Sequence, residues 1–191
     1  MPDRARARAD RLRAAQRPSF AALFGYISGS SFVLQDGYGM SPTVYSVLFG
    51  ANACGLIALS QANGALVGRV PLRTLLVAAL VLQTAAGVAL LISAATALLV
   101  GMLVSFFVLV STVGMVTPNA TALALDPHPD RAGTAAALMG GIQSVIAALA
   151  APVVGLIGEP GRGVPMAVVI AVSAAGALVA TLAVSGVRQP R

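Results

Sequence analysis

Long apolar runs that contain no Asp, Glu, Lys, Arg or His are the feature that most constrains this chain. The cleanest of them, residues 97–116, is 20 residues long and carries no charge. A helix of that length spans about 30 Å, which is the thickness of the hydrocarbon core of a bilayer. A chain built from several such runs is therefore expected to cross a membrane repeatedly.

The composition of the chain supports this expectation. Hydrophobic residues make up 58% of the 191 residues, charged residues make up only 9%, and the mean hydropathy is +0.89. Soluble domains carry about 25% charged residues, so this chain has too little charge to coat a water-facing surface. In a bilayer the lipid solvates the outer apolar face instead.

Turns rich in glycine, proline and charge separate the runs, and together they predict an all-α polytopic membrane protein with six transmembrane helices. A charged leader before an apolar run also resembles a signal peptide, but this run leads directly into further spans rather than into a secreted domain. An Arg-rich leader occupies residues 1–17 and a short tail residues 188–191. The approximate spans are residues 18–35, 43–61, 72–92, 97–116, 132–157 and 164–187.

The distribution of arginine predicts the orientation of the spans. With six helices, the leader, the tail and the second and fourth loops share one side, and they carry eleven of the twelve arginines, including Arg69 and Arg73. The positive-inside rule then places both termini in the cytoplasm of a multi-pass protein of the cell's inner or plasma membrane. Nucleic-acid binding by the basic leader was the alternative, but no soluble module accompanies it.

The stretch 117–134 concentrates charge between two apolar runs and was considered as a reactive site. Asp126, His128 and Asp130 are separated by prolines, which impose an extended, alternating backbone and point the histidine away from both carboxylates. We therefore expect no metal site there. Asp130 suits the N-cap of the following helix, and Arg131 is expected to mark the cytoplasmic face and to pair with Asp126.

No catalytic motif, phosphate-binding loop or dinucleotide fingerprint occurs in the chain, so we expect neither an enzyme nor a cofactor. No acidic residue lies inside a predicted span, so the chain shows no proton relay of its own. The single cysteine, Cys54, lies among apolar residues and is expected to be a small buried hydrophobe.

Amide and hydroxyl side chains are the polar groups inside the predicted spans. They either join helices through hydrogen bonds or line a neutral substrate cavity, and the sequence leaves both functions open. Tyr26, Asn52 and Gln143 are the preferred cavity residues because they lie near the middle of a span or beside glycine. The full set of candidates is Tyr26, Asn52, Gln61, Gln83 and Gln143.

Glycines in two of the spans indicate close helix packing. Gly50 and Gly55 occur in the second span, and Gly140 and Gly141 in the fifth. Small residues allow helix backbones to approach and slide, which suits a carrier but also suits an ordinary helix bundle.

Three segments resemble one known family. FGYISGSSFVLQDGYGMSPTVYSVLFGANACG, NGALVGRVPLR and TPNATALALDPHPDRAGTAAALMGGIQ are similar to the second half of the Bcr/CflA-type multidrug efflux transporters of the major facilitator superfamily. They correspond there to helices seven and eight, the loop after helix eight, and the loop between helices ten and eleven. The likeness covers residues 20–187. Ser31 departs from the proline that the family often has at that place.

The resemblance implies one six-helix half-bundle of the major facilitator fold, made of two three-helix inverted repeats. It implies a carrier for drugs or other small organic compounds that needs an N-terminal half, or a second copy, for proton-coupled antiport. Membrane lipid and a small-molecule substrate are the other expected partners, and nucleic acid is not. The alternative is a non-transporting membrane fragment or packing subunit from a truncated transporter gene. A membrane enzyme is disfavoured because the chain contains no catalytic motif.

Overall fold

The computed structural model describes residues 23–27, 29–125, 133, 137, 140–141, 144–145 and 163–185. Within these residues the regular structure is helical, apart from one isolated bridge between Val67 and Val70 in a turn. The all-α expectation is therefore confirmed for the part of the chain that the structure describes.

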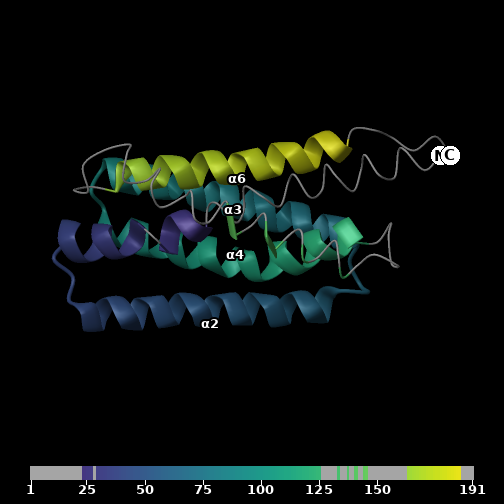
Figure 1. Ribbon diagram of the computed structural model, residues 1–191, viewed down its shortest axis with the longest axis horizontal. Coiled ribbons are helices and arrows are strands. Elements are labelled where there is room, and N and C mark those ends of the chain that lie inside the picture. Colours follow the sequence, from purple (N-terminus) through teal and green to yellow (C-terminus); the bar gives the residue numbers. More distant parts are fainter. Residues whose placement is uncertain are drawn as a thin grey trace.

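The described helices lie side by side along the long axis of the molecule (Figure 1). Helical residues 23–31, with residue 28 not described, lead into a short π-helix, η1. The helix bounds are η1 Phe32–Gly37, α2 Pro42–Leu66, α3 Leu72–Ala95, α4 Leu99–Leu125 and α6 Val164–Ser185. Helices α2, α4 and α6 run in one direction and α3 runs in the opposite direction.

Four of these helices, α2, α3, α4 and α6, are long and apolar enough to cross a membrane. They overlap four of the six predicted spans. The first predicted span, residues 18–35, is described only from residue 23 onward, and most of the fifth, residues 132–157, lies outside the described residues.

Local sequence explains where the helices begin and turn. Ser41 caps α2, its hydroxyl accepting a hydrogen bond from the backbone N–H of Val44 at 3.4 Å, and Pro42 occupies the first helical turn. Gly68 lies in the turn between α2 and α3 at φ 90°. Glycine adopts this conformation at little cost because it has no Cβ atom. Between α3 and α4 the same left-handed region is taken by Ala97, at φ 55°.

Two helices continue through residues expected to form turns. Helix α2 extends through Asn63 and Gly64 to Leu66, and α4 passes Pro118 and continues to Leu125. This corrects the placement of a turn at Asn63 and of a hinge beginning at residue 117. In a lipid environment an interrupted helix leaves backbone groups without partners, so the helical conformation persists across these local turn signals.

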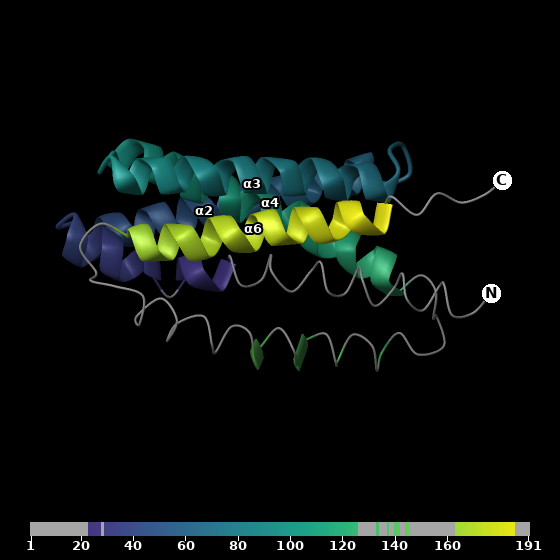
Figure 2. The same ribbon diagram turned by 90° about the horizontal axis from the view of Figure 1, so that it is seen from above.

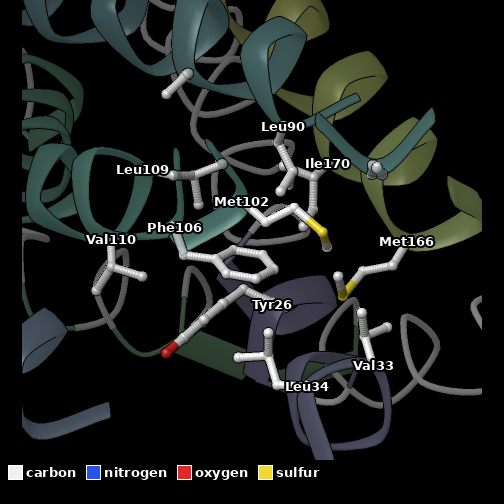
Figure 3. Close-up of a cluster of buried hydrophobic side chains, with 13 residues drawn as sticks. Tyr26, Val33, Leu34, Leu90, Met102, Phe106, Leu109, Val110, Met166 and Ile170 are labelled. Carbon is white, nitrogen blue, oxygen red and sulfur yellow. The ribbon is translucent and has the colours of Figure 1, made fainter. Parts of the chain in front are cut away.

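The main hydrophobic core lies where helix 23–31 and η1 meet α3, α4 and α6. Figure 3 shows Tyr26, Phe106, Met102 and Met166 gathered at its centre. The buried members are Tyr26, Val33, Leu34, Ala86, Leu90, Ala94, Met102, Phe106, Leu109, Val110, Met166, Ala167 and Ile170.

Helix α3 also packs closely against α6, and Figure 2 shows the two helices side by side along their length. A Cβ atom added at Gly87 of α3 would lie 3.1 Å from the Cα atom of Ala171 of α6, so the two backbones nearly touch. A second, smaller apolar cluster follows along the same helices. It consists of Leu76, Ala79, Leu80, Val116, Ala120 and Ala177.

Helix α2 is attached to the bundle by far fewer buried residues. Only 11% of its membrane-spanning window is buried, against 44% for α3 and 56% for α4. Its buried residues are Asn52, Gly55 and Asn63, none of which is a large apolar side chain. Cys54 is exposed on this helix, which corrects the expectation that it is buried.

Candidate functional site

A buried hydrogen bond joins the first helix to α2. The Nδ2 group of Asn52 donates to the phenolic oxygen of Tyr26 at 2.8 Å. Tyr26 is 3% exposed and Asn52 is 8% exposed, so this bond lies largely out of contact with solvent or lipid. Figure 3 shows the Tyr26 ring inside the apolar cluster with its hydroxyl directed away from the neighbouring core side chains. The structure thus brings together two of the residues predicted to form a cavity.

Aromatic rings extend this pair along the face of α2. Phe49 stacks on Tyr26 with 6.0 Å between ring centroids and an interplanar angle of 12°. The ring centroid of Tyr45 lies 6.1 Å from that of Phe49, and the ring centroid of Phe106 on α4 lies 5.1 Å from that of Tyr26. The four rings therefore form a continuous series from the buried core to the exposed side of α2.

A pair of hydroxyl groups lies in the same region. The oxygen atoms of Ser30 and Tyr45 lie 3.1 Å apart, within hydrogen-bonding distance. Ser30 is fully buried, Tyr45 is half-buried, and Phe49 is 40% exposed. We call Tyr26, Ser30, Tyr45, Phe49 and Asn52 the aromatic–amide cluster.

The chemistry available in the aromatic–amide cluster is limited to packing and hydrogen bonding. Its side chains offer ring faces, hydroxyls and one amide, and none of them carries a charge. Such groups bind an aromatic or otherwise apolar compound and orient it through a few hydrogen bonds. They supply no nucleophile with an adjacent base.

The other predicted cavity residues lie apart from this cluster. Gln61 is exposed on α2, nine residues beyond Asn52, and thus more than two helical turns along the axis. Gln83 is fully buried on α3, on the face that also carries Leu80 and Gly87. Gln143 lies outside the described residues.

A second buried amide pair, which the sequence did not predict, joins α2 to α4. The Nδ2 group of Asn119 donates to Oδ1 of Asn63 at 2.6 Å and to the backbone carbonyl of Met115 at 2.8 Å. Asn63 is 4% exposed and Asn119 is 1% exposed. Both lie outside the predicted spans, Asn63 in the turn after residue 61 and Asn119 in the stretch 117–134. The apolar residues that continue after each asparagine were the signal that the helix does not end there.

The charged residues at the predicted cytoplasmic side are only partly described. Arg69 lies in the turn between α2 and α3, Arg73 begins α3, and both are exposed. Asp126, Asp130 and Arg131 lie outside the described residues. Among the residues the structure describes, no group of three or more His, Cys, Asp or Glu side chains is positioned to hold a metal ion.

Two curated proteins are similar to this chain. An uncharacterised MFS-type transporter, YdgK, of Bacillus subtilis is 33% identical over 169 residues, which cover 88% of this chain and 41% of the relative. A bicyclomycin resistance protein homolog of Haemophilus influenzae is 32% identical over 136 residues, covering 69% of this chain and 33% of the relative. The chain thus spans less than half the length of both relatives. No family model and no solved structure matches it.

Apolar helices of membrane-spanning length and similarity to a transporter define the class: this is a multi-pass membrane protein related to transporters. Within that class, the chain is similar to an MFS-type transporter and to a bicyclomycin resistance protein homolog, which is consistent with the Bcr/CflA type of the major facilitator superfamily that the motifs of the sequence predicted.

Proposed function

We propose that this chain forms one six-helix half-bundle of a major facilitator efflux carrier for drugs or other small organic compounds. The observation that carries the proposal is the similarity to an MFS-type transporter over 88% of this chain but only 41% of the relative. The second relative is a bicyclomycin resistance protein homolog, and its name supports a drug as the transported compound.

The packing of the described helices supports a half-bundle of two three-helix inverted repeats. Helices α4 and α6 run in the same direction, so the connection between them has to return along the molecule. A fifth span at residues 132–157 supplies that return, and residues 18–35 supply the first span. With six spans both termini lie on one side of the membrane, and the exposed Arg69 and Arg73 support a cytoplasmic position for that side through the positive-inside rule.

The exposed face of α2 supports a larger assembly. This helix is apolar along its length, yet most of its side chains have no partner within the described part of the chain. In a twelve-helix carrier the substrate cavity lies between two halves that rock against each other. We place the aromatic–amide cluster at that cavity. The remaining half lies on the same polypeptide, on a separate one, or in a second copy of this chain. An N-terminal half also supplies the acidic groups for proton coupling, which a second copy does not, because the predicted spans of this chain contain none.

The proposal is tested by measuring drug accumulation in cells that lack their own efflux systems. The chain is expressed alone and together with a candidate N-terminal six-helix half, and bicyclomycin is the first substrate. We expect lower accumulation only when both halves are present. Unchanged accumulation in every combination would favour the alternative, a non-transporting membrane fragment.

The single cysteine provides a separate test of assembly. Cys54 is exposed on α2, so a maleimide is expected to label it in the chain expressed alone and solubilised in detergent. Coexpression of the missing half is expected to slow this labelling, because α2 then lies against another bundle. The Cys54→Ser variant is the control for labelling specificity, and equal labelling rates in both samples would argue against an interface at α2.

The orientation is tested with a fluorescent protein fused after residue 191. Such a fusion is expected to fluoresce, because a fluorescent protein folds in the cytoplasm but not after export in an unfolded state. Replacement of Arg69 and Arg73 by alanine removes positive charge from a predicted cytoplasmic loop, and we expect a mixed orientation and weaker fluorescence.

A further inference from the structure

The two polar atoms of the Asn52 side chain have different surroundings. The Nδ2 group donates a hydrogen bond to the phenolic oxygen of Tyr26 at 2.8 Å. The Oδ1 atom accepts no hydrogen bond from a described residue, yet it is not sealed inside the bundle as Oδ1 of Asn119 is. Asn52 is 8% exposed, so the acceptor end of its amide is the end that a ligand can reach.

Tyr26 fixes which end of the amide is presented. An asparagine amide can turn by about 180° about its last torsion, which exchanges its donor and acceptor ends. The ring of Tyr26 is held in place, because it is 3% exposed and lies against the rings of Phe49 and Phe106. The Tyr26 hydroxyl also interacts with that of Ser30, which can take its proton and leave its lone pairs to Nδ2. The amide is thus held with Oδ1 directed away from Tyr26.

An aromatic surface lies beside this acceptor. Phe49 precedes Asn52 by three residues on α2, so the two side chains share one face of the helix. Phe49 stacks on Tyr26 and is still 40% exposed. A Cβ atom placed at the neighbouring Gly50 would meet nothing within 4 Å, so the surface next to the ring is open. A compound on this surface therefore meets an aromatic ring and a hydrogen-bond acceptor together.

We propose that Asn52 determines the specificity of the substrate site and that Tyr26 is the positioning residue that presents its Oδ1 atom. This inference rests on the proposed function, and it names the class of compound that the site prefers: an aromatic compound that carries an N–H or O–H donor beside its ring. A compound that has only an acceptor at that place leaves Oδ1 unpaired. A site that hydrogen-bonds one group of its ligand discriminates against the analogue that lacks the group.

The preference is tested by ligand binding to the purified 191-residue chain in maltoside micelles, without transport. The chain contains three tyrosines and no tryptophan, so tyrosine emission is measured without a tryptophan background. All samples carry Tyr38→Phe, which leaves the cluster residues Tyr26 and Tyr45 as emitters. The probes are 2-naphthol, which has an O–H donor, and 2-methoxynaphthalene, which keeps the rings and the oxygen but has no donor. Saturation of the quenching gives the Kd for each probe.

We expect 2-naphthol to bind about fivefold more tightly than 2-methoxynaphthalene, which corresponds to one net hydrogen bond. Asn52→Leu is expected to abolish this preference. Tyr26→Phe is expected to abolish it as well, but by strengthening the binding of 2-methoxynaphthalene, because the released amide can turn and offer Nδ2. A merely structural role of Tyr26 would instead weaken both probes alike. Tyr26→Phe carries the test if Asn52→Leu does not fold.

Asn63→Leu is the matched control, because it makes the same change at another buried asparagine of α2, which is bonded to Asn119 and lies outside the cluster. It is expected to keep the preference for 2-naphthol. The same preference in every variant, its loss in Asn63→Leu, or quenching that does not saturate would overturn the proposal. The expected preference together with unchanged drug accumulation in cells would reject the transport function alone, so the two failures are distinguishable.

Discussion

Helix α4 takes part in two contacts of opposite character. On one side it packs against α3 and the first helix through large apolar side chains such as Phe106, Met102 and Leu90. On the other side it meets α2 through glycines and the amide pair Asn63–Asn119. Since lipid tails are as apolar as leucine, helices in a bilayer are held by close packing and hydrogen bonds rather than by exclusion of water. The first contact is made by large apolar side chains, whereas the second is a close approach of two backbones at glycines together with a polar pair.

This difference suggests which parts of the bundle stay together. The apolar contact is expected to be rigid because its side chains are closely packed, and separating them would lose many van der Waals contacts. The contact with α2 is expected to yield first. Four tests examine this comparison, and three of them have a control variant at a related position.

The largest effect is expected from Phe106→Ala. Phe106 is 1% exposed, and its loss leaves a cavity beside Tyr26. Removal of a buried phenylalanine costs about 3–5 kcal/mol in protein cores, and we expect about 3 kcal/mol here because part of the transfer term is absent in lipid. Unfolding in mixed micelles of increasing dodecyl sulfate content measures the loss.

The control for this variant is Phe107→Ala, since Phe107 is the next residue of α4 and is 43% exposed beside α2. We expect it to lower the free energy of unfolding by less than half as much. Equal losses for the two phenylalanines would remove the distinction between the two sides of α4.

The next largest effect is expected from Gly114→Ala. The added methyl group overlaps the Leu56 carbonyl, and overpacking of this kind costs about 1–3 kcal/mol. The same unfolding titration measures it. Gly50→Ala on α2 is the control, because a Cβ atom there meets nothing within 4 Å and alanine favours the helix by up to about 1 kcal/mol. A neutral Gly114→Ala variant would show that α2 already moves away at little cost.

The amide pair is expected to contribute less than either packing term. A double-mutant cycle with Asn63→Ala and Asn119→Ala isolates the interaction between the two side chains. Hydrogen bonds between transmembrane helices contribute about 0.6 kcal/mol on average and up to about 1.7 kcal/mol, and we expect a coupling energy in that range. Strict additivity of the two single substitutions would mean that the hydrogen bond adds nothing to the attachment of α2.

The smallest effect is expected from Tyr26→Phe. This change removes the acceptor for Asn52 but keeps the ring, so we expect a loss of about 0.6 kcal/mol in the same titration. Tyr38→Phe is the matched control, since the Tyr38 hydroxyl is buried and has no hydrogen-bond partner among the described residues. Its removal is expected to be neutral or stabilising. If Tyr38→Phe were as destabilising as Tyr26→Phe, the Tyr26–Asn52 bond would not explain the loss.

Only some of the predicted cavity residues come together in the structure. A polar side chain inside an apolar run is conspicuous, and on that basis Tyr26 and Asn52 were singled out; the structure joins them by a hydrogen bond. Gln61 stood out for the same reason, yet it lies exposed on α2. Nothing in the sequence separates these cases, because which face of a helix meets another helix depends on the arrangement of the whole bundle. The placement of the cluster at a substrate cavity stays a prediction.

The asparagines of the α2–α4 contact are residues whose position was predicted wrongly from the sequence. Asn63 and Asn119 stand beside Gly64 and Pro118, and these neighbours indicate turns in a soluble chain. In the bundle both segments remain helical, and each asparagine finds its partner 56 residues away. A local pattern cannot reveal such a partner, so the pair was placed in loops.

The sequence by itself determined the class of the protein, its helical nature and its relationship to the major facilitator superfamily, because runs of apolar residues and family motifs are local properties of the chain. The tertiary structure alone decided that α4 is packed through large apolar side chains on one side and through glycines and an amide pair on the other. That asymmetry depends on which glycines, rings and amides face each other across helices, and such contacts are set by the packing of segments far apart in the sequence.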